Sequence, residues 1–255
     1  MEKVSAYILT RNEEKYIREC IESVKWVDEI VIIDSFSIDD TVKIAEEMGC
    51  RIVQNKFEYF SRQRNFALSK CSYDWVICLD ADERITTKLK MEIKYELQNF
   101  PRSNIFFAPR KNKFIDKWIL HSGWYPDYRH PVFFNKKKVY YKDQLVHENV
   151  DYKGKKYYFN GDIVHYPYSN IKQFIRKSDL YTDLCSKEMF QKGKKCKIVN
   201  LFGNPIVIFF KMYFIKLGFL DGFVGLILAL LYSFFYTLMK YIKLWELQKG
   251  TNLNK

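Results

Sequence analysis

The sequence lacks the marks of several protein classes. Its six cysteines include no Cys-x-x-Cys pair and no spacing typical of a metal site, so we expect reduced, mostly buried thiols in a cytosolic protein. The first apolar run, residues 4–10, is too short for the hydrophobic region of a signal peptide. Internal repeats and low-complexity linkers are also missing. These absences argue against a disulfide-stapled, zinc-binding or secreted protein.

The composition is that of an ordered protein with an uneven charge. With 48% hydrophobic and 18% aromatic residues, the chain is expected to be ordered. Its 255 residues are enough for one large domain or one domain with an appendage. The net charge is +12, and residues 171–255 carry 14 Lys or Arg against 5 Asp or Glu, which is +9. A basic segment suits nucleic acid or an anionic membrane, and its many apolar residues favour the membrane.

The central feature is the stretch from Trp75 to Glu83. Five largely apolar residues predict a buried strand, and three carboxylates follow within four positions. Because a strand alternates its faces, Asp80 and Asp82 project to the same side, close enough to share a divalent cation. Two such carboxylates repel unless a cation or a basic group lies between them. The alternative, for Asp-x-Asp alone, is a strand followed by a solvated acidic turn.

Strands and helices alternate through the first half of the chain. Predicted strands cover residues 4–9, 29–34, 51–54 and 75–79, and predicted helices follow Asn12, Asp40 and Phe60. This alternation is typical of a parallel α/β sheet with right-handed crossovers. Thr10, Asp34 and Asp80 therefore end strands on one edge, where ligands of such sheets bind.

These segments together resemble a known family. The matching motifs are Leu9-Thr10-Arg11-Asn12-Glu13-Glu14, Ile33-Asp34-Ser35 with Asp39-Asp40-Thr41, Gln63-Arg64-Asn65, and Leu79-Asp80-Ala81-Asp82-Glu83. In this order they resemble family 2 glycosyltransferases of the GT-A fold, over about residues 3–170. Within that family the chain is most similar to bacterial lipopolysaccharide core β-glucosyltransferases.

The resemblance implies roles for the strand-end residues. Thr10, Glu13 and Asp34 would hold the nucleoside of a nucleotide sugar, here a UDP-sugar, and Arg64 would meet its base or phosphates. Asp80 and Asp82 would serve the ribose, the diphosphate and a divalent metal. One departure stands out, because Phe36 replaces the glycine usual in the second turn.

The loop of residues 121–129 is rich in aromatic and polar groups. Rings stack on the apolar face of a pyranose, and charged groups bond its hydroxyls. We therefore predict an acceptor site from Trp124, Tyr125, Asp127 and Arg129, which the family resemblance supports. The alternative is an aromatic-rich structural turn.

Two further residues complete the predicted chemistry. Inverting sugar transfer needs a carboxylate that takes the proton of the acceptor hydroxyl, and Glu148 resembles that base. GT-A enzymes commonly add a late histidine to the metal site, and His165 stands where the resemblance would place it. A carboxylate and an imidazole suit Mg²⁺ or Mn²⁺ when phosphate oxygens complete the shell.

From residue 171 the pattern changes to basic and apolar. An amphipathic helix is followed by the basic turn 192–197 and by uncharged runs of 13 residues, Ile198 to Phe210, and 18 residues, Gly222 to Met239. A spanning helix needs about 20 apolar residues, so the first run is too short and the second is borderline. We expect helices that lie in or dip into one leaflet; a true span and a soluble helical hairpin are the alternatives.

The sequence thus predicts an α/β protein of the GT-A class with two domains. Residues 1–169 would form the catalytic domain, and residues 170–255 a helical membrane-association region. The predicted activity is inverting, metal-dependent transfer of a hexose, glucose or galactose, to a lipid-linked saccharide such as lipopolysaccharide core. We expect a peripheral or monotopic protein on the cytoplasmic face of the inner membrane. The C-terminal helices could also form the interface of an oligomer. The rival function is a membrane-tethered module that binds nucleotide sugar or glycan without catalysis; no nucleic-acid motif is found.

Overall fold

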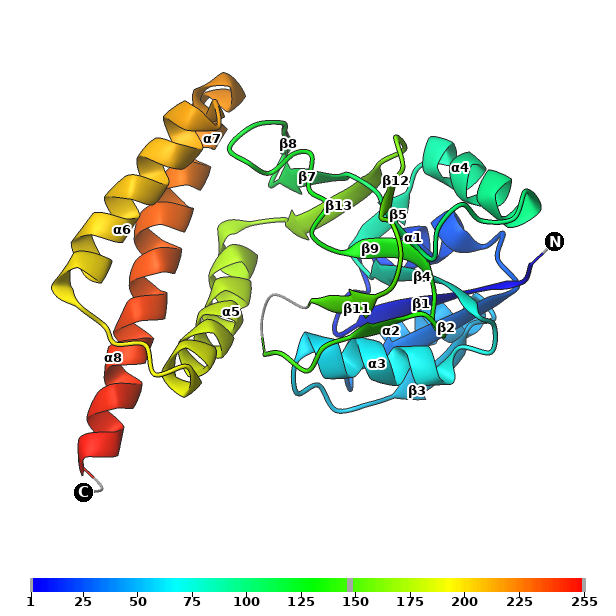
Figure 1. Ribbon diagram of the computed structural model, residues 1–255, viewed down its shortest axis with the longest axis horizontal. Coiled ribbons are helices and arrows are strands. Elements are labelled where there is room, and N and C mark those ends of the chain that lie inside the picture. Colours follow the sequence, from blue (N-terminus) through cyan, green and yellow to red (C-terminus); the bar gives the residue numbers. More distant parts are fainter. Residues whose placement is uncertain (1, 146–148, 254–255) are drawn as a thin grey trace. The chain divides into compact units, whose positions relative to one another are not determined.

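The computed structural model describes residues 2–145 and 149–253. It divides into two compact units, which are treated separately below (Figure 1). Unit 1 contains Met1–Lys111 and Asp127–His165, and unit 2 contains Asn112–Pro126 and Tyr166–Lys255. The strands β7 (Arg110–Phe114) and β13 (Ile163–Tyr168) each run from one unit into the other.

Unit 1 is built on a seven-stranded sheet of order β12-β6-β9-β4-β1-β2-β3. The strands are β1 (Val4–Thr10), β2 (Glu29–Asp34), β3 (Arg51–Gln54), β4 (Trp75–Asp80), β6 (Ile105–Phe107), β9 (Pro131–Asn135) and β12 (Tyr157–Tyr158). Neighbours from β3 to β4 pair parallel, as do β6 and β12, whereas β9 runs antiparallel to both β4 and β6. The predicted mostly parallel α/β sheet is confirmed.

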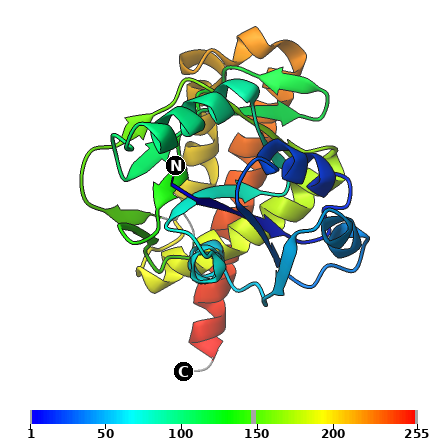
Figure 2. The same ribbon diagram turned by 90° about the vertical axis from the view of Figure 1, so that its right-hand side faces the viewer.

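Helices cover both faces of this sheet because its strands are apolar on both sides. In β1, Ala6 and Ile8 face α1 (Ile17–Val24), α2 (Thr41–Glu47) and α4 (Thr87–Gln98). Tyr7 and Leu9 face α3 (Phe60–Lys70) and the hairpin of β10 (Val139–Tyr141) and β11 (Val150–Tyr152). Figures 1 and 2 show α1 and α4 on one side of β1 and α3 on the other. Burial on both faces is what a near-continuous apolar strand requires.

One short strand completes the edge of unit 1. β5 (Glu83–Ile85) follows the acidic turn and pairs antiparallel with the start of β13, with His165 opposite Glu83. Thr86 then caps α4, since its side chain accepts a hydrogen bond from the backbone amide of Leu89. The acidic turn is therefore fixed at both of its ends.

Unit 2 combines one β-hairpin with a helical hairpin. β7 pairs antiparallel with β8 (Lys117–Ile119). After α5 (Ile171–Gln191), the chain forms α6 (Ile198–Phe210), a π-helical turn η1 (Lys211–Ile215), a short η2 (Gly218–Asp221), and a long return through α7 (Gly222–Leu230), η3 (Leu231–Tyr236) and α8 (Thr237–Leu253). Its core contains Phe114, Ile119, Tyr168, Phe174 and Leu228.

Close backbone approach at the top of the helical hairpin requires glycine. A Cβ on Gly225 would lie 2.1 Å from the carbonyl oxygen of Gly218, and one on Gly218 would lie 2.5 Å from Ser122 Oγ. Both contacts are far shorter than real side chains tolerate. These two glycines therefore let η2 fold back onto α7.

The boundaries of the units differ from the predicted division after residue 169. Residues 112–126 fold with the C-terminal helices because they bind Asp221, which is 3% exposed. Asp221 accepts hydrogen bonds from the backbone amides of Leu120 and His121 and from His121 Nδ1, and Lys117 Nζ donates to its carbonyl. A buried carboxylate needs such partners, and no local pattern predicts that they lie 100 residues upstream.

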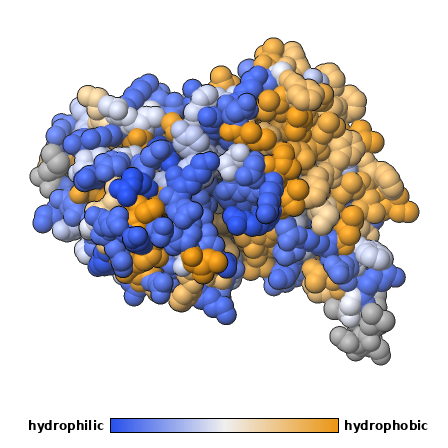
Figure 3. All heavy atoms as spheres, turned by 180° about the vertical axis from the view of Figure 1, so that it is seen from behind, coloured by the Kyte–Doolittle hydropathy of each residue, from blue (hydrophilic) through white to orange (hydrophobic). Residues whose placement is uncertain are grey.

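The first apolar helix is longer than the uncharged run suggested. It continues through the charged Lys211 to Ile215, so Ile198–Ile215 has 18 residues, and the return helix covers Gly218–Gly250. By length and composition alone, these two helices of the described chain are able to cross a membrane. Figure 3 shows the apolar surface that gathers over the C-terminal helices.

Candidate active site

Three polar strand ends meet at one edge of the sheet in unit 1, as predicted. The register places Thr10 of β1 opposite Asp34 of β2, and Leu9 opposite Asp80 of β4. Thr10 is 5% exposed, and its hydroxyl has no hydrogen-bond partner among the described residues. An unsatisfied buried hydroxyl at the carboxyl ends of parallel strands is suited to a ligand.

Asp34 is fully buried and organises the turn that follows β2. Its carboxylate accepts hydrogen bonds from the backbone amide and the hydroxyl of Ser37, and the Ser37 hydroxyl accepts one from the backbone amide of Asn12 at 2.8 Å. Between them, Phe36 adopts a φ of 57°. Left-handed backbone favours glycine, so Phe36 adopts at this position a backbone conformation that is strained for a residue with a side chain.

Glu13 lies where the first turn meets the second. Its backbone amide donates to Thr41 Oγ1 at 2.8 Å, and the Asn12 side chain accepts from the backbone amide of Ile38 at 2.9 Å. Asn12 itself has a φ of 56°, so it lies in the turn and does not cap α1, whose N-terminal flank is Tyr16. The helix predicted to follow Asn12 directly instead begins at Ile17, because Asn12 lies in the turn and its amide contacts the neighbouring loop.

Arg64 binds the first aspartate of the acidic turn. It lies on α3, is 4% exposed, and its Nη2 contacts both carboxylate oxygens of Asp80, at 3.1 and 3.2 Å. Its Nη1 lies 3.1 Å from Cys78 Sγ, and its guanidinium faces the Tyr141 ring. The basic partner that two close carboxylates require is thus Arg64. Asp80 keeps 33% of its side chain exposed.

Asp82 lies in the turn between β4 and β5, next to His165 of β13. Asp82 Oδ1 lies 3.4 Å from His165 Nε2, with side chains 6% and 20% exposed. No group of three or more His, Cys, Asp or Glu side chains within residues 2–145 and 149–253 has a metal-holding geometry. One carboxylate oxygen and one imidazole nitrogen nevertheless fit a Mg²⁺ or Mn²⁺ ion whose remaining ligands are phosphate and water oxygens.

Glu83 and Arg110 form a buried ion pair that the sequence analysis missed. Arg110 Nε lies 2.6 Å from Glu83 Oε1, and both side chains are at least nine-tenths buried. Glu83 also accepts from the backbone amide of Asp80, and Arg110 Nη1 donates to the carbonyl of His130. Burial would lower the pKa of Arg110, but Glu83 raises it overall. The only sequence signal was Glu83's place directly after the Asp-x-Asp pair.

The predicted acceptor residues divide between the units. In unit 1, the Asp127 carboxylate is 5% exposed and accepts hydrogen bonds from Arg129 Nε at 2.9 Å and from Arg129 Nη2 at 2.7 Å. Burial would raise the pKa of Asp127, but the Arg129 hydrogen bonds lower it. In unit 2, Trp124 packs on the core with its ring centroid 5.5 Å from that of Tyr232. Trp124 thus contributes to packing in unit 2, and its sugar-binding role stays a prediction.

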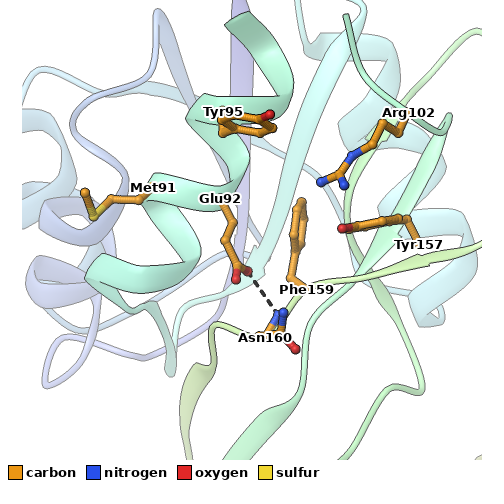
Figure 4. A pocket seen from close by; sticks show the side chains of 7 residues that line it. All are labelled: Met91, Glu92, Tyr95, Arg102, Tyr157, Phe159 and Asn160. Atoms are coloured by element: carbon orange, nitrogen blue, oxygen red, sulfur yellow. Dashed lines mark hydrogen bonds between the residues drawn. The ribbon is translucent and has the colours of Figure 1, made fainter. Parts of the chain in front are cut away.

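The predicted base, Glu148, lies outside the described residues. Unit 1 contains a pocket with a volume of 260 Å³. It is lined by Met91, Glu92, Tyr95, Arg102, Tyr157, Phe159 and Asn160 (Figure 4), and none of these is a predicted site residue. Glu92 in this pocket accepts from the backbone amides of Asn160 and Gly161, and Arg102 lies over the Tyr157 ring and binds Glu96. The two charged groups of this pocket, Glu92 and Arg102, thus already have partners inside the protein.

Comparison with known proteins gives consistent relatives. The family model described as "Glycosyl transferase family 2" matches residues 5–175. An "Uncharacterized glycosyltransferase" of Rickettsia felis is 32% identical over 92% of this chain and 87% of its own length. The "Lipopolysaccharide core biosynthesis glycosyltransferase LpsC" of Rhizobium meliloti is 27% identical over 91% of this chain and 89% of its own. A crystal structure of S. aureus TarS 1-349 in complex with UDP covers 99% of this chain and 92% of that one, with a TM-score of 0.49 and 14% identity, too distant to carry an argument. With the observed sheet, the family match confirms the predicted GT-A fold class.

Proposed function

Because the chain belongs to glycosyl transferase family 2, we propose that it moves a hexose, glucose or galactose, from a UDP-sugar to a lipid-linked saccharide with inversion at the anomeric carbon. The observation that carries the proposal is the sheet edge of unit 1. Thr10, Asp34 and Asp80 end three adjacent strands there, and Asp82 lies against His165 just beyond. The relative named for lipopolysaccharide core biosynthesis supports the choice of acceptor.

The donor would bind through the strand ends. The Thr10 hydroxyl, which has no partner in the described chain, is available to the nucleoside. Asp34 is held by Ser37 in a fixed orientation, so its position costs no rearrangement when a ligand arrives. Glu13 is positioned beside them through its backbone bond to Thr41. A preformed site of this kind favours binding because little side-chain freedom is lost.

The diphosphate end would lie at the acidic turn. When bound, a divalent metal held by Asp82 and His165 would neutralise charge on the departing diphosphate. Arg64 orients Asp80, because its guanidinium contacts both carboxylate oxygens from a buried position. Asp80 is thereby aimed at the same edge while part of its surface stays accessible. Arg64, predicted to meet base or phosphates, would then act on the donor through Asp80.

The proton acceptor would be Glu148, assigned by resemblance to the family. Its rival is Asp127, but the Arg129 hydrogen bonds lower the Asp127 pKa, and a carboxylate with a lowered pKa is a weaker base. Asp127 would instead hold Arg129, whose side chain is 76% exposed, toward the acceptor hydroxyls. Trp124 and Tyr125 remain candidates for acceptor contacts at the other end of this loop.

The C-terminal helices would seat the protein on an anionic membrane surface at its cytoplasmic face. Polar segments of unit 2 hold the return helix at both ends: Lys117 and His121 bind Asp221 at its start, and Gln248 binds Lys194 and Cys196 near its end. A spanning helix would place these ends on opposite sides of a core about 30 Å thick. The two anchors therefore support helices that lie in one leaflet. We also propose that the protein self-associates through the same helices.

The deciding experiment is a metal-dependent transfer assay. Purified full-length protein would be incubated with UDP-glucose, UDP-galactose and other nucleotide sugars, with and without Mn²⁺, and with lipid-linked core saccharide as acceptor. We expect UDP release with one hexose donor, and more of it when acceptor is present. Donor binding without release under any condition would favour the non-catalytic module and overturn the proposal.

A further inference from the structure

A groove runs between two helices of unit 2. It has a volume of 490 Å³ and is lined by Lys172, Ile175, Arg176, Asp179, Thr182, Phe235 and Met239. One wall is α5 and the other is the junction of η3 and α8. Neither the proposed sugar transfer nor any predicted site residue uses this groove.

The α5 wall carries two cations without acidic partners. Lys172 and Arg176 are four residues apart, so they project from one face of the helix together with Ile175. Both are exposed, and neither forms an ion pair with any residue that the structure describes. The one nearby acid that lines the groove, Asp179, is occupied, because Lys243 Nζ lies 2.6 Å from its Oδ1.

The opposite wall is apolar. Phe235 and Met239 are also four residues apart and share a helix face. The Phe235 ring lies 6.2 Å from Phe174 in the core, which fixes its position. The single neutral hydroxyl of the groove, on Thr182, donates to the carbonyl of Asp179 at 2.9 Å. A saccharide or a nucleoside would thus find few free hydrogen-bonding groups here.

A pair of cations beside an apolar wall matches the chemistry of an anionic lipid. We propose that this groove binds a membrane phospholipid, with its phosphate between Lys172 and Arg176 and an acyl chain along Ile175, Phe235 and Met239. Charge complementarity favours this occupant, since the basic turn of residues 192–197 also belongs to unit 2. The inference rests on the proposed membrane seat and is independent of sugar transfer.

The groove can be tested by photolabelling. Full-length protein would be mixed with phosphatidylcholine vesicles containing phosphatidylglycerol whose acyl chain bears a diazirine, and labelled peptides would be identified by mass spectrometry. We expect label on the peptides that contain Ile175 and Met239. The double variant Lys172→Gln with Arg176→Gln should lower this label about 25-fold, at about fivefold for each removed charge. The variant should still pellet with vesicles, because the apolar face of α6 is unchanged.

A matched pair of substitutions separates the groove from net charge. Lys88→Gln with Lys153→Gln removes two exposed positive charges from unit 1, and it should leave the label on α5 and α8 unchanged. An equal loss in this control, label confined to α6, or competition by millimolar inorganic phosphate would overturn the lipid assignment. If the wild-type protein does not bind vesicles at all, both the lipid assignment and the proposed membrane association are wrong. Loss of hexose transfer alone leaves the labelling result, and therefore the inference, intact.

Discussion

The two units differ in how far their apolar residues are buried and their charged residues are paired. In unit 1 the strands bury both faces, and the charged residues near the sheet edge are paired, Arg64 with Asp80 and Arg110 with Glu83. In unit 2 the outer face of α6 is open, with Ile198 78% and Phe202 68% exposed. Unit 1 therefore buries the apolar faces of its sheet internally, whereas unit 2 carries an apolar surface that requires a covering partner.

This contrast gives the same residue types different consequences in each unit. Carboxylates such as Asp34 and Glu83 of unit 1 are buried and held by hydrogen bonds, so that their loss should affect chemistry or stability. An apolar side chain on α6 is exposed, so that its loss should affect association and leave stability unchanged. The predictions below test this difference, in order of decreasing expected effect.

The largest effect should come from Glu148→Gln. The amide keeps the size of the side chain but accepts no proton, so hexose transfer should fall about 10²- to 10⁴-fold. Donor affinity should hardly change, because the proposed nucleotide contacts are on the strand ends. Transfer rates and calorimetric donor binding would be measured side by side. A rate within a few-fold of wild type, together with a large loss in Asp127→Asn, would move the base to Asp127.

Glu83→Gln should destabilise unit 1 by about 3–5 kcal/mol, because it removes the negative charge that contacts the buried Arg110 guanidinium at 2.6 Å. The measurement is the free energy of unfolding in urea. Glu19→Gln is the matched control, since Glu19 pairs with Arg84 but is 70% exposed, and its effect should stay below about 1 kcal/mol. Equal effects in the two variants would show that burial of the Glu83 pair is unimportant.

Asp82→Ala should lower the rate of metal-dependent transfer at least about a hundredfold, while the protein still folds. Removal of a buried carboxylate beside other acids should not lower stability much. The assay compares turnover at saturating donor across a Mn²⁺ titration, with circular dichroism as the fold check. Asp116→Ala, at an exposed turn of unit 2, serves as control. Wild-type turnover in Asp82→Ala would rule out Asp82 as a metal ligand.

Phe202→Asp should weaken vesicle binding at least about tenfold without changing the melting temperature, because this ring is exposed on α6. Phe100→Asp is the matched control, since Phe100 is 90% exposed in unit 1, and it should bind vesicles like wild type. Co-sedimentation with anionic vesicles at several salt concentrations makes the comparison. If the two variants behave alike, α6 is not the membrane-facing surface.

The smallest effect concerns Arg129→Ala. In the native protein the Asp127 pKa is lowered, so this pair contributes stability above the unfolded-state pKa of about 3.9 and loses it as pH falls. The variant should be less stable at pH 7 by under about 1 kcal/mol, since Arg129 is largely exposed. The difference should shrink toward pH 3. Unfolding curves at pH 7, 5 and 3 would show it, and a difference that grows in acid would contradict the assignment.

Much of unit 1 was predictable because its signals are local. Apolar runs ending in Thr10, Asp34 and Asp80 predicted parallel strands with polar ends on one edge, and the register confirms it. The family match confirms the family that these motifs indicated. The roles assigned to Glu13, Arg64 and Glu148 stay predictions, since they depend on bound substrate.

The elements, the family and the polar strand ends were predictable from local patterns, because periodicity and motif order are properties of neighbouring residues. Which distant groups meet depends on how the chain folds. It joined Arg110 to Glu83, Arg64 to Asp80, and residues 112–126 to Asp221. The physical reason is that a buried charge must find a partner wherever the fold supplies one. Spacing along the chain does not reveal that partner. For this reason the predicted division after residue 169 did not include residues 112–126 with the C-terminal helices.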